Sequence, residues 1–335
     1  MVFKRLLGAL GVGGPTVDTV LDPAPVRPGG TLAGRVRLKG GDAGFDIEHI
    51  TLELVARVEA EHEGGESEGV VAFERFTVGG GFRLAEGEER EVPFGVTVPW
   101  ETPVTELRGQ SMGVVLGVRT ELSVAGAKDK GDLDRLDVAP LPAQEAVLEG
   151  FGELGFTFRS ADLEYGRIGG SGQRLPFYQE IELLPPPGYA HRVSEIELTF
   201  LANPGGLEVV LEADRRGGLL SPGHDALTRF TVTHEQVEHQ DPAALVDGWV
   251  RQLVEHRASY GSPAAYGPDG HGPEGHHHDG HHHDGHRSGP GTGTSVAVGA
   301  AGLAVGIAGG MVAAEVVDEV GDFAEGEEEE EAEEG

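Results

Sequence analysis

The fold is decided by Val92-Pro-Phe94-Gly-Val96-Thr-Val98-Pro-Trp100 and by Val114-Val-Leu116-Gly-Val118-Arg-Thr120-Glu-Leu122-Ser-Val124-Ala125. In both segments the even positions are mostly apolar and the odd positions are mostly small or polar. Because successive side chains of a strand point to opposite faces, each segment predicts a strand with one face in a core and the other toward water. We interpret the pair as the centre of a β-sandwich that has no catalytic group built into it.

The same alternation extends toward the N-terminus. Residues 32–38 and 50–58 alternate apolar with polar or charged side chains, as half-buried strands of an antiparallel sheet do. The 55 glycines and 20 prolines favour short strands and turns over long helices. Strands separated by turns, with no helix between them, predict an all-β fold in which residues 15–140 form one antiparallel β-sandwich.

The second half of the chain repeats this pattern after Pro140-Leu141-Pro142, which we interpret as a short, stiff linker. Residues 154–158, 196–200 and 207–211 alternate in the same way, so we expect a second antiparallel sandwich over residues 144–235. The predicted fold class is therefore all-β, with two tandem sandwiches.

Short helices are predicted at both ends of this β region. Residues 1–14 form an amphipathic helix in our interpretation, since four apolar side chains share one face: Phe3, Leu6, Leu7 and Leu10. A second helix is predicted over residues 241–258, because Asp241 is a good N-cap and Pro242 suits the first turn.

Composition excludes several classes of protein. The net charge of −32 repels nucleic-acid phosphates, so we expect no nucleic-acid partner. The chain has no cysteine and therefore no disulfide, zinc-thiolate site or thiol nucleophile, which agrees with a cytoplasmic location.

The last quarter of the chain has a different character. Residues 261–294 are rich in histidine, glycine and proline with almost no apolar side chain, which predicts disorder. Residues 295–314 are apolar but consist mostly of glycine, alanine and valine, and residues 315–335 form an acidic tail.

The histidine-rich segment is the one candidate metal site. Neutral imidazole suits zinc, nickel and copper, and aspartate can complete the ligand set. The candidate ligands are His271, His276, His277, His278, Asp279, His281, His282, His283, Asp284 and His286. We expect no cofactor to be required, and the alternative to a biological metal site is a hydrophilic linker that happens to chelate divalent transition metals.

Residues 295–314 leave three alternatives open. At about 1.5 Å per residue the segment is long enough to span a bilayer of about 30 Å. Gly302, Gly306 and Gly310 recur at a four-residue spacing that lets helices approach closely. The segment therefore predicts contact with or anchoring in the plasma membrane, self-association into a homo-oligomer, or disorder until a partner binds.

Two further motifs have ordinary interpretations. Gly109-Gln-Ser111-Met-Gly113 matches the hydrolase pattern Gly-x-Ser-x-Gly, but that chemistry needs a strand-to-helix turn and a strand pattern follows here. Residues 129–137 are dense in carboxylates but lack the glycine and distal glutamate of a calcium loop. We interpret both as loops and expect no catalytic residue.

Several short segments follow one another in order over residues 1–235: Phe3-Lys-Arg-Leu-Leu7, Val17-Asp-Thr-Val-Leu21, Val26-Arg-Pro-Gly-Gly-Thr-Leu-Ala-Gly34, Val92-Pro-Phe94 with Val98-Pro99, Arg135-Leu-Asp-Val-Ala-Pro140, Gly152-Glu-Leu-Gly-Phe156, Leu175-Pro-Phe-Tyr-Gln-Glu180 and Leu211-Glu-Ala-Asp-Arg215. On these segments the chain resembles the sporulation-control protein family of bacteria (stage zero, M type), which has an arrestin-like fold. The resemblance implies two arrestin-like sandwiches and a non-enzymatic regulatory or scaffolding role, exerted through protein partners in bacterial development or in division and envelope control. The alternative function is metal binding through the histidine-rich tail.

Overall fold

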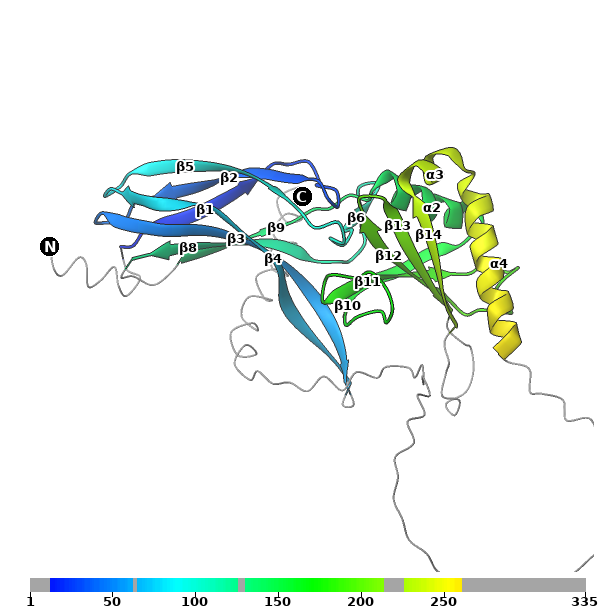
Figure 1. The fold of residues 1–335 in the computed structure, drawn as a ribbon. Helices are drawn as coiled ribbons and strands as arrows, with labels where there is room; N and C mark the ends of the chain where they lie inside the picture. The colour runs from blue at the N-terminus through cyan, green and yellow to red at the C-terminus, as the bar shows by residue number, and fades with distance from the viewer. Residues whose placement is uncertain (1–12, 63–64, 126–129, 214–225, 261–335) are drawn as a thin grey trace, which may run out of the picture.

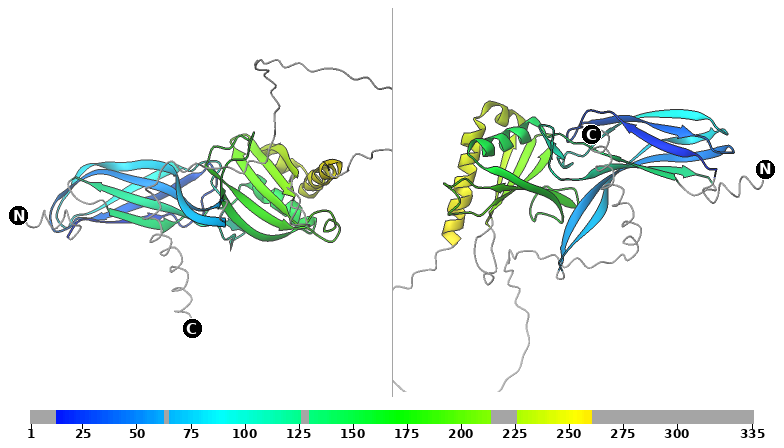
Figure 2. Two further views of the ribbon diagram at one scale, coloured as in Figure 1. Left: turned by 90° about the horizontal axis from the view of Figure 1, so that it is seen from below. Right: turned by 180° about the vertical axis from the view of Figure 1, so that it is seen from behind.

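The computed structural model describes residues 13–62, 65–125, 130–213 and 226–260. This part of the chain is mainly antiparallel β, as the sequence predicts. Two units lie end to end, with residue 13 at one end and the last helix at the other (Figures 1 and 2). Each unit has its own apolar core.

The first unit is a sandwich. Its strands are β1 (Thr16–Leu21), β2 (Thr31–Lys39), β3 (Phe45–His62), β4 (Gly65–Leu84), β5 (Glu89–Thr97), β8 (Leu116–Val124) and β9 (Lys130–Arg135), with a small hairpin of β6 (Glu106–Leu107) and β7 (Gln110–Ser111). One sheet has the order β1-β2-β5, and β4, β3, β8 and β9 pair in the other.

Alternation in the sequence produces the core between these two sheets. Val36, Leu52, Leu54, Val118 and Leu122 are completely buried, while the alternating residues Glu53, Arg119 and Glu121 are only partly buried. The two sheets meet along one side, where the Thr19 N–H donates to Asp132 at 2.6 Å and the Thr19 and Thr120 hydroxyls lie 2.7 Å apart.

The second unit is one antiparallel sheet with helices against one face. Its elements are α2 (Pro142–Glu153), β10 (Thr157–Tyr165), β11 (Phe177–Leu184), β12 (Ile196–Asn203), β13 (Gly206–Ala213), β14 (Ala226–Thr233), α3 (His234–His239) and α4 (Pro242–Tyr260). The strands pair in chain order from β10 to β14. Val147 and Phe151 of α2 and Val250 and Leu253 of α4 share a core with the strands, and Trp249 stacks on Phe230 at 5.0 Å.

Helix α2 occupies residues that the sequence analysis assigned to the linker and to the start of a second sandwich. The second layer of this unit is accordingly helical. Pro142 is the first residue of α2, a position at which its missing N–H costs nothing. The Gln144 side chain accepts a hydrogen bond from the Leu141 N–H at 2.9 Å, which fixes the start of the helix. Helix α4 begins at Pro242, where the sequence predicts a helix over 241–258.

The two units are joined in one continuous sheet. The β3–β4 hairpin extends past the sandwich and lies beside β10, where Glu59 pairs with Glu164 (Figure 1). The buried Gln179 side chain accepts from the Val104 N–H at 2.9 Å and donates to the Val104 carbonyl at 2.8 Å. Glu101 accepts from the backbone N–H of Arg174 and of Leu175 at 2.8 and 3.0 Å. These bonds form a joint that holds the two units in a fixed relative position.

Several predicted segments lie outside the described residues. They are most of the N-terminal helix predicted over 1–14, the histidine-rich segment 261–294, the apolar segment 295–314 and the acidic tail 315–335. Their predicted properties stay predictions.

Helices α2 and α4 cross closely at Gly150, which gives a stability prediction. A methyl group on Gly150 would lie 2.5 Å from the Pro242 carbonyl oxygen, whereas one on Gly152 would meet nothing within 4 Å. Gly150→Ala is expected to lower the free energy of unfolding by about 1–3 kcal/mol through overpacking. Gly152→Ala, the matched control in the same helix, is expected to leave stability unchanged or raise it by up to about 1 kcal/mol. Urea titrations of both variants check this, and equal effects would contradict the close crossing.

Candidate functional site

Carboxylates gather on the face of the second-unit sheet that points away from the helices. We call this surface the acidic face and define it by Asp162, Glu164, Glu180, Glu182, Glu197 and Glu212, all of which are half-buried. It draws on four neighbouring strands, β10 to β13. The opposite face of the same strands carries the apolar residues Ile181, Ile196, Leu198, Val209 and Leu211, which are buried in the core.

The strand register places these carboxylates directly opposite one another. Glu182 pairs with Glu197, and Glu197 pairs with Glu212, so three glutamates form a row across three strands. Asp162 pairs with Glu180 in the neighbouring row. Like charges directly opposite on a sheet repel each other and destabilise it. The acidic face therefore carries an electrostatic cost within the folded unit.

This repulsion appears in the titration of two groups. Burial, and then the negative charges of Glu197 and Asp162, raise the pKa of Glu180 to about 9. Burial and the neighbouring Glu180 also raise the pKa of Tyr178 above its usual range. Near neutral pH Glu180 is thus protonated, which removes one negative charge from the acidic face.

Two arginines contact carboxylates at the ends of the acidic face. Arg159 lies 3.3 Å from Glu182 and also contacts Glu195. At the far edge Arg229 lies 3.8 Å from Glu208 and donates to the Gly169 carbonyl. Both arginines stand at the ends of the face.

Three members of the acidic face could contribute metal ligands. Carboxylate oxygens of Asp162, Glu164 and Glu180 lie within 4.8 Å of one another. Hard cations such as calcium and magnesium prefer oxygen ligands of this kind. Calcium takes about six to eight oxygens, so most of a coordination shell would have to come from elsewhere.

A loop after β10 crosses one end of the acidic face. The Gln173 side chain holds this loop by donating to the carbonyls of Gly166 and Leu175, both at 2.8 Å, and by accepting from the Ile168 N–H. The Gly172 N–H donates to Glu208 at 3.4 Å, which ties the loop to β13. The row of Glu182, Glu197 and Glu212 lies at the opposite end of the strands.

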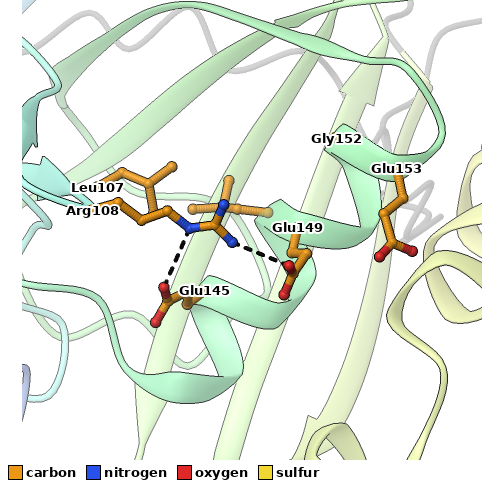
Figure 3. Close-up of a pocket in the computed structure, with 7 residues that line it drawn as sticks. Leu107, Arg108, Glu145, Glu149, Gly152 and Glu153 are labelled. Carbon is orange, nitrogen blue, oxygen red and sulfur yellow. Dashed lines mark hydrogen bonds and ion pairs between the residues drawn. The ribbon is translucent and has the colours of Figure 1, made fainter.

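A shallow hollow of about 300 Å³ lies between the β6–β7 hairpin and α2 (Figure 3). Arg108 enters it from the hairpin turn and lies 3.5 Å from Glu145 and 3.2 Å from Glu149. Arg108 and Gly109 have φ angles of 54° and 77°, as a two-residue type I′ turn requires. The ion pairs hold the hairpin against α2, and the hollow is open to solvent.

The two motifs weighed in the sequence have structural roles. Ser111 is exposed on β7, and its hydroxyl accepts a hydrogen bond from the Gly113 N–H at 3.3 Å. The next element is strand β8, so the helix of a hydrolase elbow does not follow. Asp132 binds the Thr19 N–H where the two sheets meet, and burial together with Asp132 and Asp18 raises the pKa of Asp134 to about 7.

The candidate residues named from the sequence lie outside the described part of the chain. These are the histidine-rich ligand set over 271–286 and Gly302, Gly306 and Gly310. The acidic face was not predicted, although its signal was present. Gln179-Glu-Ile-Glu182 and Ile196-Glu-Leu198 place glutamate at every outward position, but alternation alone does not say which glutamates face one another.

Fold and site together define a two-unit, mainly antiparallel β protein with an acidic sheet face. The chain belongs to the SpoOM protein family, whose model matches residues 3–217. It is similar to the sporulation-control protein spo0M of Bacillus subtilis (strain 168), with 38% identity over 249 residues that make up 72% of this chain and 94% of that protein. The crystal structure of Spo0M from Bacillus subtilis matches with a TM-score of 0.64 and 33% identity, over 73% of this chain and 100% of that chain.

These findings confirm the resemblance inferred from the sequence and place the chain in a family of sporulation-control proteins. The similarity to the solved structure covers 73% of this chain, which confirms the mainly β fold. Within the described ranges no helix is long and apolar enough to cross a membrane.

The raised pKa of Glu180 predicts how stability changes with pH. The folded protein keeps this proton up to about pH 9, whereas the unfolded chain loses it near pH 4.5. Between these values the folded state binds more protons, so stability falls as pH rises. Glu180→Gln is expected to match the parent in stability at pH 4 and to gain on it by up to about 1.4 kcal/mol for each pH unit above about pH 5, so that it is several kcal/mol more stable at pH 8.

Chemical unfolding of the parent and Glu180→Gln between pH 4 and 9 measures this difference. The control is Glu255→Gln, which removes an exposed carboxylate from α4. A stability gain from Glu180→Gln that does not vary with pH would show that Glu180 has the same pKa in the folded and unfolded states.

Proposed function

We propose that this chain is a non-enzymatic regulatory protein that acts in bacterial developmental control by binding other proteins through its β units. The observation that carries the proposal is its membership of the SpoOM family, whose model matches the first unit and the second unit as far as β13, with a 38% identical relative named as a sporulation-control protein. Such a role needs surfaces that other proteins can recognise.

Two structural features support binding as the mode of action. The joint formed by Gln179, Val104 and Glu101 holds the two units in one orientation, so that surfaces on both can contact a partner together. The acidic face keeps carboxylates on an open sheet surface despite their mutual repulsion, and a partner of opposite charge would relieve that repulsion.

The location that suits this role is the cytoplasm. The chain has no cysteine, as is usual for proteins of a reducing compartment. Contact with the plasma membrane through residues 295–314 is part of the same proposal. These residues would then decide where the protein acts, while the β units decide what it binds.

Affinity capture from the native cell tests the proposal, using the full chain and a version that ends at Tyr260. The shorter chain is expected to retain a defined set of proteins from the soluble fraction, because it contains both β units. If neither version enriches any protein over an unrelated acidic control protein, the proposed function fails. If enrichment is lost with residues 261–335, the binding function belongs to the tail.

A second candidate function is binding of zinc, nickel or copper by the tail. It is favoured by the repeated His-His-His-Asp-Gly sequence at 276–280 and 281–285. Many imidazoles on a glycine-rich segment can adopt several ligand geometries, so binding is expected to discriminate little among these metals.

Calorimetry with zinc tests this second function. The full chain is expected to bind zinc at neutral pH and to lose binding near pH 5, because protonated imidazoles do not bind metal. Replacing the histidines of 276–286 by serine should abolish the heat. Binding that survives the replacement would place the metal elsewhere, and no heat from the intact chain would exclude the function.

A further inference from the structure

Strand edges are the parts of a sheet that can bind another chain through main-chain hydrogen bonds. In the first unit these edges are mostly covered. β9 lies against β1 through the hydrogen bond from Thr19 to Asp132. β4 lies beside β5 within the sandwich, where a methyl group on Gly79 would contact Val92 at 3.1 Å.

The projecting part of β4 has features that discourage pairing. Register shifts at Ile50/Thr51 and Leu54/Val55 interrupt the pairing of β4 with β3 just before the projection, and the projecting part carries the exposed Glu68. Bulges and charges of this kind protect edges in natural proteins.

β14 is the terminal strand of the continuous sheet and lacks these features. It pairs with β13 over its whole length without a register shift, from Gly206/Thr233 to Ala213/Ala226. Its sequence, Ala226-Leu-Thr-Arg-Phe-Thr-Val-Thr233, contains no proline or lysine, and its one charged side chain, Arg229, is held by Glu208 and Gly169. In the described structure its backbone makes no hydrogen bond to an element other than β13, except that the Thr233 N–H donates to Gln236.

The charge beside this edge indicates what it would accept. Glu212 pairs with Leu227 of β14. The row of side chains across this face is therefore Glu182, Glu197, Glu212 and Leu227, and it ends at the open edge of β14. Leu227 is 40% exposed. A residue added beyond Leu227 on the same face would stand two strand spacings, or about 10 Å, from Glu212.

We propose that β14 accepts an extended, basic segment of a partner protein as an additional strand of the sheet. This inference rests on the proposed protein-binding function and names the surface and the chemistry of the partner. A lysine or arginine beyond Leu227 lays its aliphatic stem on the exposed leucine and brings its charged head to Glu212. Main-chain hydrogen bonds hold the segment, and the carboxylate row selects basic sequences over acidic ones.

A labelled peptide of alternating lysine and valine is the probe, used with the full chain at physiological salt. Fluorescence anisotropy is expected to show saturable binding, and the corresponding glutamate–valine peptide is expected not to bind. Two N-methylated versions of the lysine–valine peptide separate strand pairing from charge attraction. In each version the backbone N–H groups along one edge of the peptide are blocked, and the two versions are blocked along opposite edges. One of them should bind at least tenfold more weakly and the other should bind normally, because a strand pairs through one edge only.

The acidic tail of residues 315–335 would also attract a basic peptide by its charge. The two N-methylated peptides control for this attraction, because they carry the same charge as the parent peptide. Attraction by charge alone would leave both N-methylated peptides equal to the parent peptide. Equal binding of the two, or no saturable binding of the parent peptide, would overturn the proposal.

Two leucine variants place the binding on the protein. Leu227→Lys puts a positive charge on the edge strand and is expected to weaken peptide binding at least tenfold. Leu184→Lys is the matched control, because Leu184 is also 40% exposed but lies on β11, an interior strand of the same sheet. Equal weakening by both variants would contradict docking at β14.

The same variants separate this inference from the proposed function. If Leu227→Lys captures the same proteins from cells as the parent chain, partners dock elsewhere and only the β14 inference fails. If the parent chain itself captures no protein, the proposed function fails. Thermal unfolding of each variant shows whether the edge substitution leaves the fold intact.

Discussion

The side-chain amide of Gln179 is the contact on which the arrangement of the molecule depends. It binds both the N–H and the carbonyl of Val104, as a neighbouring strand would, and it does so in a buried position. An unsatisfied buried backbone group costs about 1–3 kcal/mol, so both units are stabilised in one relative position. On the surface, Glu101 makes a second contact of this kind. Its carboxylate accepts hydrogen bonds from the backbone N–H groups of Arg174 and Leu175, which precede β11.

The fixed joint determines which surfaces are presented together. Because β3 and β10 are joined at Glu59 and Glu164, the sheet of the first unit continues into that of the second. The helices α2 and α4 cover one face of the second sheet, which leaves the carboxylates on the other. The acidic face and the terminal strand β14 adjoin each other within the second sheet.

Alternation within a strand was predictable from the sequence, whereas pairing between strands was not. The pattern over Val114–Ala125 predicted β8, because apolar side chains at every second position require one buried face. Pro142 was interpreted as part of a linker, although proline is also common at the first position of a helix, and α2 begins there. The carboxylates of Glu180 and Glu197 were visible as outward positions, but their proximity depends on a register that no local pattern specifies.

Binding of the proposed basic partner would be coupled to the protonation of Glu180. Glu180 keeps its proton near neutral pH because burial and the surrounding carboxylates disfavour its charge. A cationic side chain placed over the row would offset the repulsion and lower the pKa of Glu180, so binding would release a proton. Repulsion that destabilises the isolated protein would thereby strengthen its complex with a basic partner, and more so as pH rises. An acidic face of this kind lowers the stability of the free protein in a way that favours association.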